Sequence, residues 1–432
     1  MGDGMVRGAA TISLGFGRGQ MDFTFDPARF DVLDAGRADG PTLDDAAIEA
    51  RFDDPIGSPP LAGIVRPGER VGVVVPDATR ASGSNRVVPL LLARLNALGV
   101  PDARVEILVG GGTHRAPTAG EIGRIVGDDV ARRVAVHAHD AFDAAAHVVL
   151  GETPRGTPVE INRRLVEVDR VVLVGAIGFH YFAGFSGGRK GLLPGCGSDP
   201  AIQKNHLLGF DRATLRKADG VESGRLDGNP VSEDMEACAA LFGPSYLVNT
   251  VLDGAGRITR AYAGHWRAAH RLGCDEYRAA HSVAAPGRRD VVVVSCGGAP
   301  RDLNLIQSHK ALEHARVVLN DGGDLILLAE CSEGLGREDF LDWFVPGGSR
   351  ATALKLVDNY RINGQTAWGI RWKSERFRVR LVSRLDPEVV RRMGMIPFAT
   401  LEEAASGISA GRGYILPRGI STLPALVEAS AG

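Results

Sequence analysis

The sequence has few of the residues that mark secreted, membrane or nucleic-acid-binding proteins. Its 432 residues include only five cysteines, with no CxxC pair. A disulfide framework or a cysteine-based zinc site is therefore not indicated, and the thiols are expected to be small buried residues. No apolar run is long enough to span a bilayer, and the N-terminal region lacks the apolar stretch of a signal peptide. The net charge of −2 provides no basic excess. We expect a cytoplasmic protein with neither a nucleic-acid nor a membrane partner.

Lysine is also scarce, because only six of the 50 basic residues are lysine. A chain that otherwise uses arginine for positive charge gains little from one more surface lysine. Lys190, which lies in a glycine-rich segment, is therefore expected to serve amine chemistry.

Strand and helix patterns alternate along most of the chain. Buried strands are predicted at Val71–Val75, Arg104–Val109, Val134–Ala138 and Arg170–Val174. Between the first two, Asn85–Leu98 carries apolar residues at helical spacing. This alternation predicts an α/β fold with mainly parallel sheets, whose functional loops follow the carboxyl ends of the strands.

The composition changes to AAPGRR at Ala284–Arg289, which we interpret as a linker. Strand, helix and strand patterns then resume at Val291–Val294, Leu303–Ala315 and Leu325–Ala329. The sequence therefore predicts two α/β domains, residues 1–286 and 290–432, with an active-site cleft between them. We expect the first to bind a cofactor and the second to close over the site, with its last residues able to pack back on the first domain.

Two short motifs follow predicted strands in the first domain. In DATR, Arg80 could hold a carboxylate through two parallel hydrogen bonds, with Asp77 beside it. The alternative is a helix-capping aspartate and a structural arginine. In GGGTHR, three glycines leave the His114 imidazole on a loop with little steric cover, although a core histidine is the alternative.

The segment from His180 to His206 has the highest density of residues suited to chemistry, and it reads HYFAGFSGGRKGLLPGCGSDPAIQKNH. Its glycines permit close approach of a phosphate or nucleotide, and its histidines can accept protons or bind a metal. A Walker loop is excluded because Arg189 precedes Lys190 and Gly191 follows it. The histidine spacing does not match HExxH, so a metal here would take most ligands from elsewhere, such as a cofactor. A structural role for His206 is the alternative.

In the second domain, Gln307 and Lys310 are three residues apart on a predicted helix and therefore share one face. They could point together into the expected cleft. The alternative is an ordinary solvated helix face.

Taken together, the motifs DxTR, GGTHR, H-x3-GFSGG-x-K followed sixteen residues later by the NH histidine, and Q-x2-K resemble the lactate racemase family. The resemblance extends from about Thr11 to Val427. This family comprises 2-hydroxyacid racemases and epimerases that use a nickel-pincer nucleotide. That cofactor is Ni(II) with pyridinium-3-thioamide-5-thiocarboxylic acid mononucleotide, made by biosynthetic enzymes of the host.

The resemblance implies a role for each matching residue. His114 and His180 would be the acid/base histidines, Lys190 would hold the pyridinium ring, and His206 would be the nickel ligand. Residues implied to contact the substrate are Asp77, Arg80, Gln307, Lys310 and Trp368. Residues implied to approach the cofactor phosphate are Gly184, Ser186, Gly187 and Gly188.

The implied reaction inverts C2 of a 2-hydroxyacid. A histidine takes the hydroxyl proton while C2 gives hydride to the cofactor, and hydride return to the other face of the transient 2-keto acid completes the inversion. Where the lactate enzyme carries an aromatic residue before the glutamine, this chain has Ile306, and the segment Asn363–Arg371 also departs from that enzyme. We therefore expect a substrate that is not restricted to lactate.

Two other classes of function stay open. A metal-dependent oxidoreductase or hydrolase could use the same histidines without hydride return, and the oxidoreductase would release a keto acid. A non-catalytic nickel- or nucleotide-binding protein could keep the fold, although storage alone needs neither candidate base.

Overall fold

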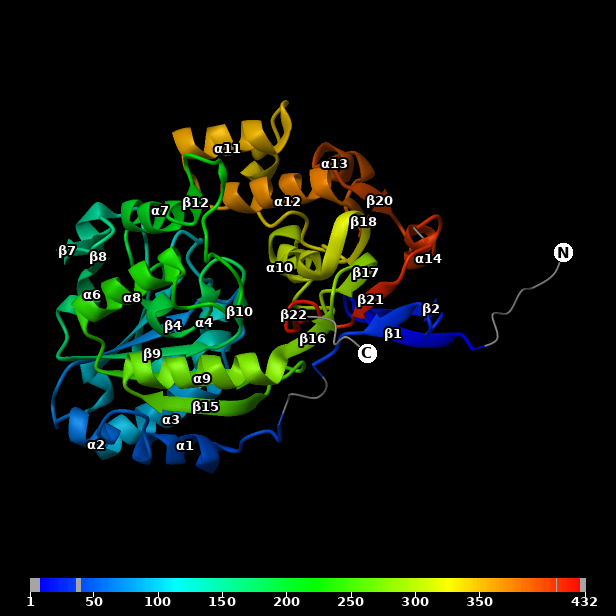
Figure 1. Ribbon diagram of the computed structural model, residues 1–432. Coiled ribbons are helices and arrows are strands. Elements are labelled where there is room, and N and C mark those ends of the chain that lie inside the picture. Colours follow the sequence, from blue (N-terminus) through cyan, green and yellow to red (C-terminus); the bar gives the residue numbers. More distant parts are fainter. Residues whose placement is uncertain (1–7, 36–39, 409, 428–432) are drawn as a thin grey trace. The chain divides into compact units, whose positions relative to one another are not determined.

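The computed structural model describes residues 8–35, 40–408 and 410–427. The chain divides into two compact units, each assembled from separate segments (Figure 1). The first unit takes its residues from Met1–Gly36, Phe210–Lys217 and Ala280–Gly432. The second takes its residues from Arg37–Gly209 and Ala218–Ala279.

The second unit is built on a six-stranded sheet with the order β15-β14-β9-β4-β5-β6. Its neighbours are parallel except for the antiparallel pair of β14 and β15. The sheet strands are β4 (Val71–Pro76), β5 (Val105–Gly110), β6 (Ala135–Ala138), β9 (Arg170–Ala176), β14 (Tyr246–Leu252) and β15 (Ile258–Gly264). The helices are α1 (Asp45–Asp53), α2 (Leu61–Ile64), α3 (Ser84–Ala97), α4 (Ala119–Val126), α5 (Asp128–Arg133), α6 (Arg163–Val166), α7 (Asp199–Leu207), α8 (Pro230–Phe242) and α9 (Trp266–His281). Shorter elements are β7 (His147–Glu152), β8 (Pro158–Asn162), β10 (Phe179–His180), β11 (Gly184–Phe185), and the 3-10 turns η1 (Asp102–Arg104), η2 (Ala144–Ala146) and η3 (Gly188–Gly191).

Burial on both faces explains the continuous apolar strands of this sheet. Along β4, Val71, Val73 and Val75 point to one face, where they join a core formed with apolar residues of α1 to α5. Val74 points to the other face, toward η3, because a Cβ placed on Gly191 would lie 3.6 Å from its side chain. Helices α1 to α5 thus cover one face of the sheet, while the glycine-rich segment lies against the other.

The first unit has a second six-stranded sheet, with the order β20-β19-β18-β17-β21-β3, in which every neighbouring pair is parallel. The sheet strands are β3 (Phe30–Val32), β17 (Arg289–Ser295), β18 (Leu319–Leu328), β19 (Arg378–Val382), β20 (Ile396–Phe398) and β21 (Gly413–Leu416). The helices are α10 (Leu305–Ala315), α11 (Gly348–Asp358), α12 (Gly364–Arg376), α13 (Pro387–Arg392) and α14 (Leu401–Ala405), with 3-10 turns η4 (Arg316–Val318) and η5 (Glu338–Trp343). The remaining strands are β1 (Ala10–Phe16), β2 (Gly19–Phe25), β12 (Phe210–Asp211), β13 (Arg216–Lys217), β16 (Ser282–Pro286) and β22 (Leu423–Val427).

The N-terminal segment forms part of this first unit rather than of the second. In it, β1 and β2 pair as an antiparallel hairpin. β3 then pairs with β21, which is almost 400 residues later in the chain. The rings of Phe23 and Phe30 pack edge to face 5.7 Å apart, and both residues join the apolar core of the same sheet.

These pairings change the domain boundaries expected from the sequence. The prediction placed residues 1–286 in one domain, whereas the segments Met1–Gly36 and Phe210–Lys217 belong with the C-terminal sheet. The predicted linker at Ala284–Arg289 is wrong in its conformation, because β16 ends at Pro286 and β17 begins at Arg289. The last described residues form β22, which pairs in parallel with β16. Backbone pairing over long sequence separations leaves no local composition signal, which accounts for these differences.

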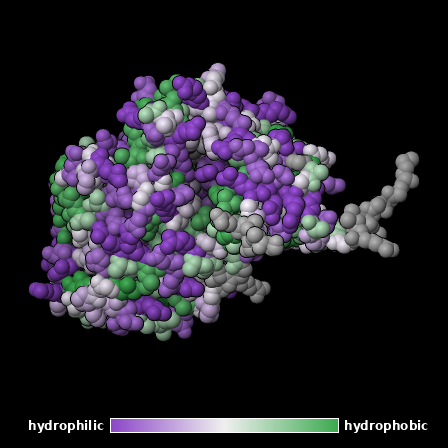
Figure 2. All heavy atoms as spheres, in the orientation of Figure 1, coloured by the Kyte–Doolittle hydropathy of each residue, from purple (hydrophilic) through white to green (hydrophobic). Residues whose placement is uncertain are grey.

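The predicted fold class is confirmed: this is an α/β protein with two mainly parallel sheets. Throughout the described ranges, no helix has the length and apolar character needed to cross a bilayer. The face seen in Figure 2 intersperses polar and charged side chains with apolar ones. All five cysteines are buried free thiols, as the sequence predicts.

Candidate functional site

Three adjacent strands of the second unit end at the same edge of the sheet. β4 lies between β5 and β9, and Pro76 at the end of β4 is in register with Gly110 at the end of β5. Asp77 follows β4, His114 follows β5, and His180 lies just beyond β9. This is the edge where open α/β sheets bind ligands.

Asp77 and His114 form a hydrogen-bonded pair. The His114 Nδ1 lies 2.5 Å from Oδ2 of Asp77, whose Oδ1 accepts hydrogen bonds from Oγ1 and the backbone N–H of Thr79. Burial alone would raise the pKa of Asp77, but the hydrogen bond from His114 and the charge of Arg80 outweigh it and lower the pKa to about 2. Asp77 is thus a buried carboxylate that holds the His114 ring, not the helix cap of the alternative interpretation, because α3 begins after Gly83.

Arg80 lies in the same loop, where its backbone N–H donates to the carbonyl of Asp77. Its side chain is exposed, and within residues 8–35, 40–408 and 410–427 its guanidinium forms no hydrogen bond or ion pair. This guanidinium is available to a carboxylate supplied from solution.

His180 is held by the turn that follows it. The strands β10 and β11 pair as a two-residue hairpin, and the backbone N–H groups of Phe182 and Ala183 donate to Nδ1 of His180 over 3.3 and 3.1 Å. The ring also stacks on Tyr181. Its imidazole is therefore oriented by backbone donors, in contrast to His114, which is oriented by a carboxylate.

The glycines of the next segment are required by the protein's own packing. Gly184 has φ of +74°, and a Cβ there would lie 1.9 Å from the carbonyl oxygen of Arg225. Gly188 has φ of +54°, and a Cβ there would lie 2.5 Å from the His270 ring. Only glycine fits either position, whether or not a phosphate approaches the segment.

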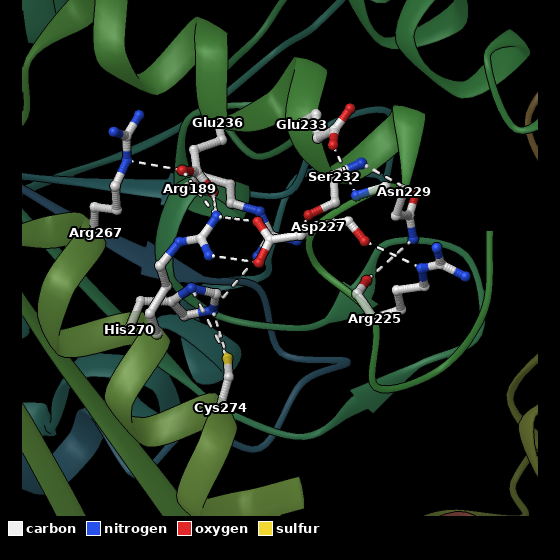
Figure 3. A network of polar contacts seen from close by, with 12 residues as sticks. Arg189, Arg225, Asp227, Asn229, Ser232, Glu233, Glu236, Arg267, His270 and Cys274 are labelled. Carbon is white, nitrogen blue, oxygen red and sulfur yellow. Dashed lines mark hydrogen bonds and ion pairs between the residues drawn. The ribbon is translucent and has the colours of Figure 1, made fainter. Parts of the chain in front are cut away.

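Arg189 and His270, which belong to the polar network drawn in Figure 3, also bind the backbone of this segment. The fully buried Arg189 donates to the carbonyl of Ala183 and to the hydroxyl of Ser232 on α8. His270 on α9 lies 3.0 Å from the carbonyl of Ser186, whose own hydroxyl donates to the carbonyl of Ala176. The sequence did not single out Arg189 or His270, and their contacts fix the backbone on both sides of the glycines.

Lys190 and the loop of His114 are connected through a tight turn. Lys190 is buried in η3, and its carbonyl accepts a hydrogen bond from Gly195. The carbonyl of Gly195 in turn accepts from the backbone N–H of Gly112. This turn therefore brings the lysine segment against the GGGTHR loop.

His206 lies near the end of α7, a helix that starts just after the same turn. Asn205 beside it anchors the helix by donating to Asp234 on α8. The buried His206 ring packs 5.3 Å from that of Phe182, in the His180 hairpin. Burial, together with the positive charge of Lys190, lowers the pKa of His206 to about 3, so the ring is neutral. Its Nδ1 is buried without a hydrogen-bond partner among the described residues.

The remaining predicted residues belong to the first unit. Gln307 and Lys310 share a face of α10, since Lys310 Nζ donates to Oε1 of Gln307 over 2.6 Å. Trp368 on α12 is buried, packs edge to face with Phe210 at a centroid distance of 5.1 Å, and stacks on Trp372. Both tryptophans line a surface cavity of about 480 Å³.

Helices α10 and α12 also carry a charged cluster that the sequence did not predict. Glu313 on α10 accepts from the Lys373 ammonium and from Nε of Arg316, and Lys217 Nζ lies 3.5 Å away. Lys373 also lies 3.0 Å from Nε2 of His309. Burial is the main cause that lowers the pKa of Lys373 to about 7. The local signals for this cluster were the i, i+4 spacing of His309 and Glu313 and the i, i+3 spacing of Glu313 and Arg316.

Comparisons with known proteins agree with this architecture. Residues 16–216 match the model of the lactate racemase N-terminal domain, and residues 285–414 match that of the lactate racemase C-terminal domain. The lactate racemase of Thermoanaerobacterium thermosaccharolyticum is 31% identical over 338 residues, covering 78% of each chain. The lactate racemase of Lactiplantibacillus plantarum is 30% identical over 398 residues, covering 87% of this chain and 90% of the other.

Solved structures show the same fold. The lactate racemase apoprotein of T. thermosaccharolyticum superposes with a TM-score of 0.87 at 28% identity, covering 96% of this chain and all of the other. A protein of Thermotoga maritima shares the fold with a TM-score of 0.69 at 19% identity, covering 90% of this chain and 100% of the other. The class defined by fold and family is that of the racemases, which are isomerases. The chain belongs to the lactate racemase family.

Proposed function

We propose that this protein inverts C2 of a 2-hydroxyacid as a racemase or epimerase, that it works with a nickel-pincer nucleotide, and that its substrates are not restricted to lactate. The observation that carries the proposal is the clustering of Asp77, His114, His180, Lys190 and His206 around one sheet edge and the turn beside it. All five residues belong to the family motifs, and all five lie in the second unit of this chain.

The residues present fit the proposed cofactor. His206 is a buried, neutral imidazole with an unpartnered nitrogen, which suits a metal ligand. In the described part of the chain, no three His, Cys, Asp or Glu side chains gather in a group that could hold a metal. His206 would therefore be a single protein ligand beside donors that the cofactor itself brings. Lys190 would hold the cofactor ring, and the segment with Gly184, Ser186, Gly187 and Gly188 would hold its phosphate.

When bound, the cofactor supplies an acceptor for the C2 hydrogen and its electron pair, so that no carbanion forms beside the carboxylate. The chain's own residues would bind the substrate and manage its hydroxyl proton. Arg80 would pair with the carboxylate, and His114 and His180 would contact the hydroxyl. Gln307, Lys310 and Trp368 are proposed as substrate-binding residues from the first unit.

The cofactor assignment is tested by producing the full chain together with the host's cofactor-biosynthesis enzymes. We expect about one nickel per chain and a visible chromophore, and the purified protein should racemise a 2-hydroxyacid. His206→Ala should lose both nickel and chromophore, because it removes the single protein ligand.

The matched control is His139→Ala, which removes another buried histidine. The ring nitrogens of His139 form hydrogen bonds with the carbonyl of Gly197 and the side-chain amide of Asn162. That variant should keep its nickel. Retention of nickel by His206→Ala at the wild-type level would contradict the ligand assignment. Accumulation of a free keto acid from the wild type would favour the oxidoreductase alternative.

A further inference from the structure

The surface cavity of the first unit is lined mainly by the hairpin of β12 and β13 and by helices α11 and α12. The hairpin is fixed to α11 because Arg212 donates to the carbonyl of Val357. It is fixed to α12 because Phe210 packs on Trp368 (Figure 1). The volume of about 480 Å³ is that of a small-molecule site, since such sites enclose about 300–1,000 Å³.

The apolar wall of this cavity is a ladder of side chains on α12. Trp368, Trp372 and Arg376 are spaced four residues apart and therefore lie on one face of the helix. The two indole rings stack at a centroid distance of 6.2 Å, and the Arg376 guanidinium lies 5.2 Å from the Trp372 ring centroid. Arg316 lies over the same ring at 5.8 Å. Because its neighbours hold Trp372 in place, the wall is preformed.

The charge of the lining follows from the alternation of side chains along β13. Successive side chains of a strand point to opposite sides. Lys217 points to the buried cluster, where its ammonium lies 3.5 Å from Glu313. Arg216, one residue earlier, lines the cavity instead. The hairpin thus gives one cation to an ion pair of the fold and presents the other to the cavity.

The two carboxylates that line the cavity are engaged within the protein. Asp321 accepts from Nε of Arg376 over 2.6 Å. Glu375 accepts from the backbone N–H and the hydroxyl of Ser349, at the start of α11. The Glu375 carboxylate also lies 3.3 Å from Nε of Arg371. Neither carboxylate is therefore left to neutralise a further arginine.

Two arginines of the lining have no such partner. Arg216 and Arg350 are exposed, and within residues 8–35, 40–408 and 410–427 neither guanidinium forms a hydrogen bond or an ion pair. A guanidinium favours carboxylate and phosphate groups, because its fork of N–H donors matches their paired oxygens. The cavity therefore combines two uncompensated positive charges with an indole wall.

We propose that this cavity binds a small organic anion: Arg216 and Arg350 bind its carboxylate or phosphate group, and an apolar ring of the same molecule packs against Trp368 and Trp372. Aromatic side chains favour such ring contacts, whereas the guanidinium groups select for negative charge. The inference goes beyond the proposed function, because the residues that carry it all lie in the first unit. Trp368 is shared with the residues proposed to bind the substrate, so the test separates the two sites.

Isothermal titration calorimetry on the full chain tests the ligand class, with phenyl phosphate and phenylacetate as probes. Benzyl alcohol carries the ring without the charge, and inorganic phosphate carries the charge without the ring. We expect at least one of the two ring-bearing anions to bind, and to bind more weakly as salt is added. The tighter of the two identifies the anionic group. Both comparison compounds should bind at least roughly tenfold more weakly. Equal binding of either comparison compound, or no binding of both anions at millimolar concentration, overturns the proposal.

Arginine variants test the location of the anionic group. Arg216→Gln and Arg350→Gln should each weaken binding of the better probe roughly tenfold, since each removes a charged donor. Arg361→Gln is the control, because Arg361 is exposed between α11 and α12 and does not line the cavity. It should bind as the wild type does, and an equal loss in all three variants would contradict the proposal. Arg80→Gln should also bind normally, whereas loss of binding in that variant would place the ligand at the sheet edge of the second unit and overturn the proposal.

The indole N–H signals of the four tryptophans locate the ring of the ligand independently. NMR spectra of the chain carrying ¹⁵N-labelled tryptophan are recorded with and without the better probe, and Trp368→Phe and Trp372→Phe identify the two signals of the cavity. We expect these two signals to shift, and those of Trp266 and Trp343, which do not line the cavity, to stay in place. Shifts confined to Trp266 or Trp343, or no shift at all, overturn the proposal. Because no measurement here involves racemisation, failure of the proposed function would leave this result unchanged.

Discussion

Histidine, lysine and carboxylate side chains gather in two regions of the molecule, but their surroundings differ. In the first unit, Glu313 is enclosed by Lys373, Arg316, Lys217 and His309 on helical and hairpin elements, and the cluster is largely buried. At the sheet edge of the second unit, Asp77 holds only one side of the His114 ring, and Arg80 nearby is exposed. Charges that satisfy one another on several sides stabilise a fold, whereas groups fixed on one side remain available to a ligand.

The largest effect should come from comparing one variant in each region by its kcat and its free energy of unfolding. His114→Ala should lower kcat by roughly 10²- to 10⁴-fold, the usual contribution of a general base. Its free energy of unfolding should fall less than that of the Lys373 variant below, because the buried Asp77 carboxylate keeps its two donors from Thr79 and the charge of Arg80. Steady-state racemisation and urea denaturation on the same preparation measure both quantities.

Lys373→Met should show the reverse pattern. Removing the buried ammonium leaves Glu313 with less compensation, and breaking a buried pair costs about 3–5 kcal/mol of unfolding free energy. The kcat per folded molecule should stay near the wild-type value. Adding Glu313→Gln to this variant should restore part of the stability. A large loss of kcat in Lys373→Met, measured where the variant is fully folded, would place this cluster in the active site. It would then not differ in role from the sheet edge of the second unit.

A smaller effect should appear as acid destabilisation shared by the two units. Burial lowers the pKa of His139 to about 4, of His270 to about 3 and of His314 to about 4. Unfolded histidines take up protons near their ordinary pKa of about 6.5, whereas these folded ones stay neutral. The free energy of unfolding should therefore fall as the pH drops from about 7 to 4.

Urea midpoints measured at several pH values over this range test the linkage. Asp77 adds a loss of stability in the same direction at lower pH, because its lowered pKa makes its contribution complete above pH ~4 and lost as the pH falls toward 2. A midpoint that does not change between pH 7 and 5 would show that the buried histidines are protonated in the folded protein.

Much of this could be predicted from sequence because it is local. The runs that became β4, β5 and β9 are continuous and apolar, and the loops after them carry the motifs, so parallel pairing alone puts Asp77 and His114 at one edge. The membership of β3 in the C-terminal sheet could not be predicted, since it depends on pairing with β21 from the far end of the chain.

The hydrogen-bond partners of His114 and His180 also could not be predicted from the sequence. Nothing in DATR and GGGTHR fixes which side of His114 the carboxylate occupies, and nothing in HYFAG indicates that the backbone of Phe182 and Ala183 turns back onto His180. Lysine scarcity singled out Lys190 but applied equally to Lys373, whose surroundings are those of an ion-pair cluster. Composition identifies unusual residues, and only packing separates their roles.

The central claim is that the protein changes configuration at C2 without making the C2 hydrogen an exchangeable acid. The most direct test is to incubate the cofactor-loaded enzyme with one enantiomer of a C2-deuterated 2-hydroxyacid in ordinary water and to follow the label in the racemised product by mass spectrometry. The account predicts that the product keeps its deuterium, because the histidines handle only the hydroxyl proton. Loss of the label to solvent at the rate of racemisation would mean that a side chain removes the C2 hydrogen as a proton, and would contradict the account.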